Sequence, residues 1–174
     1  MIFSLRWSPV LVLGLLMLPI SGWAAGPTPV SLPPSASQRI ILTVTGPTGT
    51  LQTFTHAQVE ALGTYRLTTK TFWPDDDGTY EGVMLADVLK QAKLDTQAKV
   101  QVTALDGYSV AIPSEDWTRW QVLLATRRDG RPLTVRNKGP LRLIFPMALD
   151  TKLAVRSMGG HWAWMIKSIG IAPK

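Results

Sequence analysis

The sequence has 174 residues, of which 18 are basic and 12 acidic, so its formal net charge is +6, and it contains no cysteine. A chain without cysteine has no disulfide bonds, no thiol nucleophile, no Cys-X-X-Cys redox pair and no cysteine-ligated zinc or iron–sulfur cluster. Its length suits one domain with a substantial hydrophobic core.

The first 24 residues have the pattern of an export signal. Arg6 gives a short positive start, Val10–Ile20 is mainly apolar, and Gly22 and Ala24 are small residues placed as at a cleavage site. The apolar run is shorter than the ~20 residues of a membrane span, although an uncleaved anchor is the alternative. We therefore expect residues 1–24 to be a signal peptide and the protein to be periplasmic or secreted.

Proline and serine dominate the next segment. Residues 26–38 contain four prolines and three serines, a composition that favours an extended chain over a packed element. We expect residues 25–38 to be a linker and residues 39–174 to form one domain.

Residues 40–72 predict strands and a short helix. Alternating apolar and polar residues indicate strands at Ile40–Thr45, Leu51–Thr55 and Tyr65–Phe72. Thr55 followed by Gln58 is a capping-box pattern, which predicts a helix that reaches Leu62 and stops at Gly63.

An acidic run follows the third predicted strand. The residues Asp75, Asp76, Asp77 and Gly78 suggest a calcium loop, but the ligand spacing of an EF-hand is missing. The sequence therefore predicts a solvated acidic loop.

A helix and a hairpin are predicted next. Apolar residues at i, i+3, i+4 and i+7 predict a helix over Leu85–Lys93. The dipeptide Asp106-Gly107 lies between the alternating segments Lys99–Leu105 and Tyr108–Ile112, which is a strong hairpin signal.

The C-terminal part predicts one helix and four strands. Ser114 is expected to cap a helix whose first turn is acidic. Strands are expected at Gln121–Thr126, Leu133–Arg136, Leu141–Phe145 and Met165–Ile171. Many short strands with few helices indicate a β-rich α+β domain.

Basic residues cluster between positions 127 and 156. This stretch contains only two acidic residues and eight basic ones: Arg127, Arg128, Arg131, Arg136, Lys138, Arg142, Lys152 and Arg156. A cluster of one sign attracts anions, and arginine presents paired donors to phosphate, but a solvated basic surface is the plainer interpretation. No nucleic-acid-binding motif is present, so we expect no nucleic-acid partner.

Arg142 lies inside the apolar segment Leu141–Phe145. A charged group in an apolar strand is normally paired or functional. The sequence leaves two roles open for Arg142: an ion pair with a carboxylate at the edge of the core, or ligand binding.

Several segments together resemble the sulfite-oxidase-like molybdopterin oxidoreductases. The spacing of Asn137, Arg142 and Pro146, with Gly139-Pro140 between them, matches a signature of that family, and Tyr80–Leu85 and Ile166–Ile169 resemble two further segments. The resemblance implies the family's α+β fold. It also implies that Asn137, Arg142 and Lys167 hold the polar atoms and phosphate of the pterin cofactor, with a purely structural role as the alternative.

The metal ligand is where this chain departs from the resemblance. In the family a cysteine thiolate holds the metal, whereas the equivalent stretch here, Thr68–Trp73, offers only threonine hydroxyls. A hydroxyl that stays protonated at neutral pH does not replace a soft thiolate. We therefore expect either molybdopterin or no cofactor, and no redox catalysis.

Aromatic residues suggest a further surface. Trp162 and Trp164 alternate as on a strand, and with Trp73, Lys138 and His161 they are candidates for a flat-ligand or partner-binding surface. Core packing for the tryptophans and a surface hydrogen bond for His161 are the alternatives.

The expected function is therefore an exported molybdopterin-oxidoreductase-like domain that is not itself an enzyme. It would bind a small anionic ligand or a membrane-associated partner protein. The alternatives are a molybdopterin-dependent oxidoreductase with a non-cysteine metal ligand, and a purely structural domain.

Overall fold

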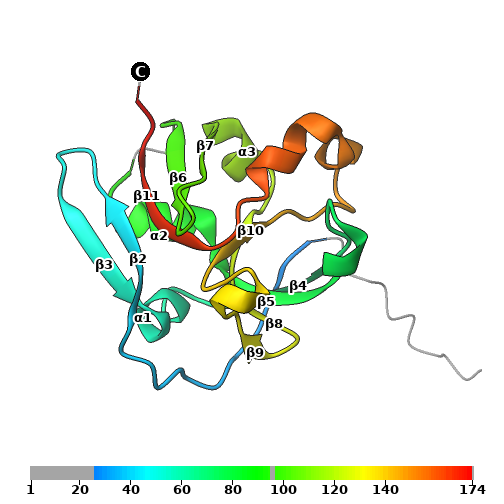
Figure 1. Ribbon diagram of the computed structural model, residues 1–174, viewed down its shortest axis with the longest axis horizontal. Helices are drawn as coiled ribbons and strands as arrows, with labels where there is room; N and C mark the ends of the chain where they lie inside the picture. Colours follow the sequence, from blue (N-terminus) through cyan, green and yellow to red (C-terminus); the bar gives the residue numbers. More distant parts are fainter. Residues whose placement is uncertain (1–25, 95–96, 174) are drawn as a thin grey trace, which may run out of the picture.

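The computed structural model describes residues 26–94 and 97–173, and it folds into two β-sheets with short helices around them (Figure 1). This strand-rich arrangement confirms the predicted α+β class. The expected signal peptide, residues 1–24, lies outside the described residues. Within the part that is described, no helix has the length and apolar character needed to cross a membrane.

The first sheet, here called sheet A, is antiparallel throughout. Its strands are β1 (Thr28–Pro29), β4 (Tyr65–Thr69), β5 (Gly78–Met84), β8 (Leu123–Arg128), β9 (Arg131–Pro132) and β10 (Arg142–Ile144). They run in the order β1-β4-β5-β8-β10, and β9 pairs with β8 to form a hairpin.

The second sheet, sheet B, is mixed. It contains β2 (Ile40–Thr45), β3 (Leu51–Thr55), β6 (Val100–Ala104), β7 (Ser109–Ile112) and β11 (Ile166–Ile171). Their order is β3-β2-β11-β6-β7, with β11 parallel to β2 and antiparallel to β6. The hairpin predicted at Asp106-Gly107 is confirmed by the pairing of β6 with β7.

Three α-helices lie within the described residues: α1 (His56–Glu60), α2 (Leu85–Gln91) and α3 (Ser114–Arg119). The capping box before α1 is confirmed, because Thr55 accepts from Gln58 N at 3.3 Å and Thr55 N donates to Gln58 Oε1 at 2.8 Å. The cap predicted at Ser114 is wrong. Pro113 holds the cap position in extended backbone, so Ser114 is already the first helical residue.

The sequence missed the central strand β5, whose neighbours are β4 and β8. Its residues from Tyr80 to Val83 are buried on both faces, so no alternation of polar and apolar residues marks it. Gly82 is needed there, since an added Cβ would lie 2.2 Å from the carbonyl oxygen of Leu124 on β8.

Two predicted strands differ from the structure. The strand predicted at Tyr65–Phe72 ends at Thr69, because the Thr71 backbone N–H turns to bind Asp77 Oδ1 at 2.6 Å. The strand predicted at Leu133–Arg136 is wrong, because Val135–Asn137 forms a 3₁₀ turn, η2, closed by the Asn137 N–H on Thr134 O at 2.8 Å.

The proline-rich segment that precedes β2 is extended, as expected, but it also packs against sheet A. Its strand β1 pairs with β4, and the Val30 N–H donates to Thr64 O at 2.9 Å. Further along, the carbonyl of Pro33 accepts from Arg127 at 2.7 Å. Part of this segment is therefore held in place by hydrogen bonds to the domain.

Candidate functional site

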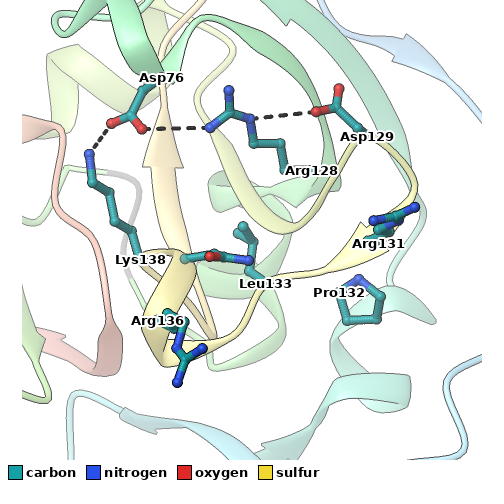
Figure 2. A pocket seen from close by; sticks show the side chains of 9 residues that line it. Asp76, Arg128, Asp129, Arg131, Pro132, Leu133, Arg136 and Lys138 are labelled. Atoms are coloured by element: carbon teal, nitrogen blue, oxygen red, sulfur yellow. Dashed lines mark hydrogen bonds and ion pairs between the residues drawn. The ribbon is translucent and has the colours of Figure 1, made fainter.

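A pocket of about 510 Å³, here called the basic pocket, opens beside the β8–β9 hairpin and the turn η2 (Figure 2). Nine residues line it: Asp76, Arg128, Asp129, Arg131, Pro132, Leu133, Arg136, Asn137 and Lys138. Four are cations and two are carboxylates, so the lining carries a formal charge of +2. The charge cluster seen in the sequence therefore gathers partly at one concavity.

Asp76 is the centre of the charge network at this pocket. Its carboxylate pairs with Lys138, with Arg142 at 3.2 Å and with Arg128 at 3.6 Å. Figure 2 shows Lys138 and Arg128 reaching the same carboxylate. Burial would raise the pKa of Asp76, but the cations Lys138 and Arg142 hold it below its ordinary value.

The acidic loop predicted from the sequence is therefore not simply solvated. Asp76 is only 6% exposed and lies in the 3₁₀ turn η1 (Pro74–Asp76), just before β5. The sequence offered no signal that would separate Asp76 from its neighbours Asp75 and Asp77, because the burial follows from tertiary packing.

Arg142, on β10, is 1% exposed. Its guanidinium donates to Asp76 Oδ2 and to the Tyr80 hydroxyl, both at 3.2 Å, and it lies 5.2 Å from the centre of the Tyr80 ring. Of the two roles left open by the sequence, the structure shows the ion pair. Burial raises the pKa of Tyr80, so this phenol stays protonated beside the arginine.

The other two predicted cofactor-binding residues are Asn137 and Lys167. Asn137 lines the basic pocket from η2. Lys167 is exposed on β11 of sheet B and lines neither the basic pocket nor the aromatic pocket described below. The backbones of β10 and β11 come close, since the Ile166 N–H donates to Leu141 O at 3.0 Å. Asn137 lines the basic pocket with Lys138 and Asp76, and Asp76 in turn pairs with Arg142.

Two arginines of the basic pocket stand out by their lack of partners. Arg131 on β9 and Arg136 in η2 are exposed, and neither has a side-chain hydrogen bond or ion pair with any described residue. In Figure 2 no interaction reaches them, whereas Arg128 and Lys138 are held by Asp76. Their donors are therefore available to an anion.

A second pocket, here called the aromatic pocket, has a volume of about 390 Å³. It is lined by Phe72, Trp73, Asp106, Tyr108, Arg156, Gly159, Gly160, Trp162, Ala163 and Trp164. The three tryptophans predicted to share a surface all line it. The Trp162 ring also packs in the core, because its centre lies 5.3 Å from that of Phe145 and the residue is only 1% exposed. Trp162 therefore both packs in the core and lines the pocket.

Neither Lys138 nor His161 is among the residues that line the aromatic pocket, although Lys138 lies over two of its rings. Lys138 approaches from the basic pocket, and its ammonium lies 5.7 Å and 5.0 Å from the ring centres of Trp73 and Trp164. His161 does not line the pocket, since its Nδ1 lies 2.7 Å from Asp116 Oδ2 on α3. A hydrogen bond near the surface, the plainer alternative for His161, matches this contact.

The stretch in place of the cysteine does not fit a thiolate-held metal. Thr69 Oγ1 donates to Lys70 O at 2.9 Å and accepts from Met147 N at 3.2 Å, while Thr71 Oγ1 donates to Trp73 O at 2.6 Å. Both hydroxyls thus form hydrogen bonds with backbone groups. Residues 26–94 and 97–173 also hold no cluster of three or more His, Cys, Asp or Glu side chains suited to a metal ion.

Residues 76–155 match the family model described as the oxidoreductase molybdopterin binding domain. Over 77 residues, 44% of this chain and 39% of the relative, the sequence is 32% identical to the uncharacterized oxidoreductase YuiH of Bacillus subtilis (strain 168). The sulfane dehydrogenase SoxCD from Paracoccus pantotrophus is similar in structure, with a TM-score of 0.54 and 18% identity over 76% of this chain and 38% of that chain. The chain spans about two fifths of the length of either relative.

Proposed function

We propose that this chain, in which residues 76–155 match the oxidoreductase molybdopterin binding domain and no cysteine is present, is a binding domain without thiolate–molybdenum redox chemistry. Its ligand is a small anion of the phosphate type, bound in the basic pocket. The observation that carries this proposal is the pair of exposed arginines, Arg131 and Arg136, that line one concavity and have no partner among the described residues.

The chemistry of the lining supports an anion with several oxygens. Each guanidinium presents a planar fork of donors that matches phosphate, and the Asn137 amide adds a neutral donor. The Asp76 carboxylate does not oppose such a ligand strongly, because Lys138, Arg128 and Arg142 surround it. Asp129 is similarly close to Arg128, at 3.6 Å.

The phosphate-type anion is also the part of a pterin cofactor that these residues suit. At the metal end, the threonine hydroxyls at positions 69 and 71 are poor substitutes for a thiolate. Under this proposal the chain binds an anion at its basic pocket and has no thiolate metal site.

Export and a membrane-associated partner remain parts of the proposal that rest on the sequence. The apolar N-terminal segment and the basic surface support them. Co-purification from detergent-solubilised membranes is the direct check, because recovery of the protein alone would count against a stable partner.

We expect inorganic pyrophosphate to bind the wild-type protein and to bind the variants Arg131→Ala and Arg136→Ala about ten-fold more weakly. Each change removes one charged hydrogen-bonding group, and a hydrogen bond to a charged group contributes about 1.5–3 kcal/mol. The double variant should bind pyrophosphate about 100-fold more weakly. Isothermal titration calorimetry at fixed ionic strength measures these changes.

The control variant Lys90→Ala/Lys99→Ala removes the same formal charge from exposed positions that do not line the pocket. It should retain most of the wild-type affinity. Equal losses of pyrophosphate affinity in the two double variants would show that only the net charge matters. If the wild-type protein binds no pyrophosphate, the proposal is wrong.

A further inference from the structure

The aromatic pocket is built from three segments that are distant in the sequence. Phe72 and Trp73 follow β4, Asp106 and Tyr108 belong to the β6–β7 turn, and the remaining lining comes from the segment 156–164. This last segment includes the 3₁₀ helix η4 (Arg156–His161), which contacts β7. The pocket thus lies where sheet A, sheet B and η4 meet.

Edge-to-face contacts hold the aromatic walls. Trp73 lies between Phe72 and Trp164, with ring centres 5.3 Å and 4.8 Å apart and interplanar angles of 70° and 68°. Edge-to-face contact is a favoured geometry for aromatic pairs. The walls are therefore largely formed before any ligand arrives, as is usual for small-molecule sites.

Two glycines bring the backbone of η4 close to the aromatic rings. An added Cβ on Gly159 would lie 3.2 Å from the Phe72 ring, and one on Gly160 would lie 3.2 Å from the Tyr108 hydroxyl. The Tyr108 hydroxyl donates to Gly160 O at 2.9 Å, which ties η4 to the β6–β7 turn. Small residues thus set the width of the pocket.

The charges of the lining are one cation and one anion. Arg156 is exposed and has no side-chain partner among the described residues, so its guanidinium is available. The Asp106 carboxylate already accepts from the backbone N–H of Tyr108 at 2.9 Å. Together with the net charge of +6, this favours a ligand whose polar group is negative.

We infer that the aromatic pocket is a second binding site, for a small planar aromatic carboxylate. Its ring lies against Trp73 and Trp164, and its carboxylate pairs with Arg156 in the two-pronged geometry that a guanidinium allows. A volume of about 390 Å³ lies within the usual range for small-molecule sites, about 300–1,000 Å³, at the end that suits one or two rings.

This site is distinct from the anion site proposed above. The two pockets have no lining residue in common, although Lys138 of the basic pocket lies over the rings of Trp73 and Trp164. Phosphate-type anions have no flat apolar surface that could pack against the aromatic walls. The two proposals can therefore fail separately.

The test uses 2-naphthoate as the probe, with 2-naphthalenemethanol and 2-naphthylmethylamine as the neutral and cationic analogues, in calorimetric titrations of the full chain. We expect naphthoate to bind the wild-type protein about ten-fold more tightly than the alcohol, because a hydrogen bond to a charged group contributes about 1.5 kcal/mol. Arg156→Ala should remove that preference and leave the affinity for the alcohol unchanged. Trp164→Leu should weaken the binding of both naphthoate and the alcohol.

Arg39→Ala is the matched control, since Arg39 is also exposed and lines neither pocket. It should bind naphthoate like the wild-type protein. Three results would overturn the inference: no binding of naphthoate to the wild-type protein, equal or tighter binding of the amine, or a naphthoate affinity that falls in Arg131→Ala/Arg136→Ala and not in Arg156→Ala.

Discussion

Asp76→Asn is expected to destabilise the protein by about 3–5 kcal/mol, because it leaves the buried guanidinium of Arg142 without its carboxylate. Arg142 would keep its hydrogen bond to the Tyr80 hydroxyl, but its Nε already has no hydrogen-bond partner in the described part of the chain. Lys138 would lose its ion pair as well. Urea unfolding followed by tryptophan fluorescence measures the change in the free energy of unfolding.

Asp75→Asn is the matched control for this prediction. Asp75 is the preceding residue, it is exposed, and its carboxylate takes no part in the ion pairs around Asp76. Its effect should stay within about 0.5 kcal/mol. The double variant Asp76→Asn/Arg142→Met should recover part of the loss, since replacing both members of a buried pair is often nearly neutral. Equal stability of Asp75→Asn and Asp76→Asn would show that the network contributes nothing.

Glu60→Gln is expected to cost about 3 kcal/mol at pH 7. Arg127 is 4% exposed and donates to both carboxylate oxygens of Glu60, at 2.7 Å and 2.6 Å, and Thr126 adds a third hydrogen bond at 2.7 Å. Burial would raise the pKa of Glu60, but the hydrogen bonds from Arg127 and Thr126, together with the nearby His56 ring, lower it from 4.5 to about 2. A depression of this size corresponds to about 3 kcal/mol.

The pH dependence follows from the direction of that shift. Because the pKa of Glu60 is lower in the folded state, its contribution is complete above pH 4.5 and is lost as the pH falls from 4.5 through about 2. The stability difference between wild type and Glu60→Gln should therefore be constant from about pH 6 to 7 and shrink below pH 4.5. Glu115→Gln, at an exposed position of α3, should show no comparable difference. A difference that stays unchanged down to pH 2.5 would contradict the assignment.

Much of the fold could be predicted because local patterns and tertiary packing agree. The capping box at Thr55 and the Asp106-Gly107 hairpin depend on neighbouring residues alone, and both are present in the structure. The strand β5 could not be found in this way. A strand buried on both faces carries no alternation, and the residue that fixes its contact with β8, Gly82, is typical of a turn in sequence terms.

The sequence predicted the positive charge of the candidate site, but not which of its residues form ion pairs. A run of basic residues left an anion-binding surface and a solvated surface open, and Arg131, Arg136 and Lys138 line one pocket. Which cations remain available depends on Asp76, whose burial no local pattern reveals. The same holds for Arg142, because its partner is 66 positions away in the sequence.

The aromatic residues illustrate the same limit. The sequence grouped Trp73, Trp162 and Trp164, and all three line one pocket. It could not show that η4 interrupts the strand-like alternation before Trp162, or that His161 turns toward Asp116 on α3. Both features arise from contacts between segments that the periodicity of a single segment does not encode.

The molybdenum content of the protein, purified from its own organism and checked for pterin fluorescence, tests the proposed loss of thiolate–metal chemistry most directly. We expect only traces of molybdenum and no bound pterin, because the chain has no cysteine and the hydroxyls of Thr69 and Thr71 are hydrogen-bonded to the backbone. One molybdenum per chain, together with a bound pterin, would contradict the account and favour an oxidoreductase with a non-cysteine ligand.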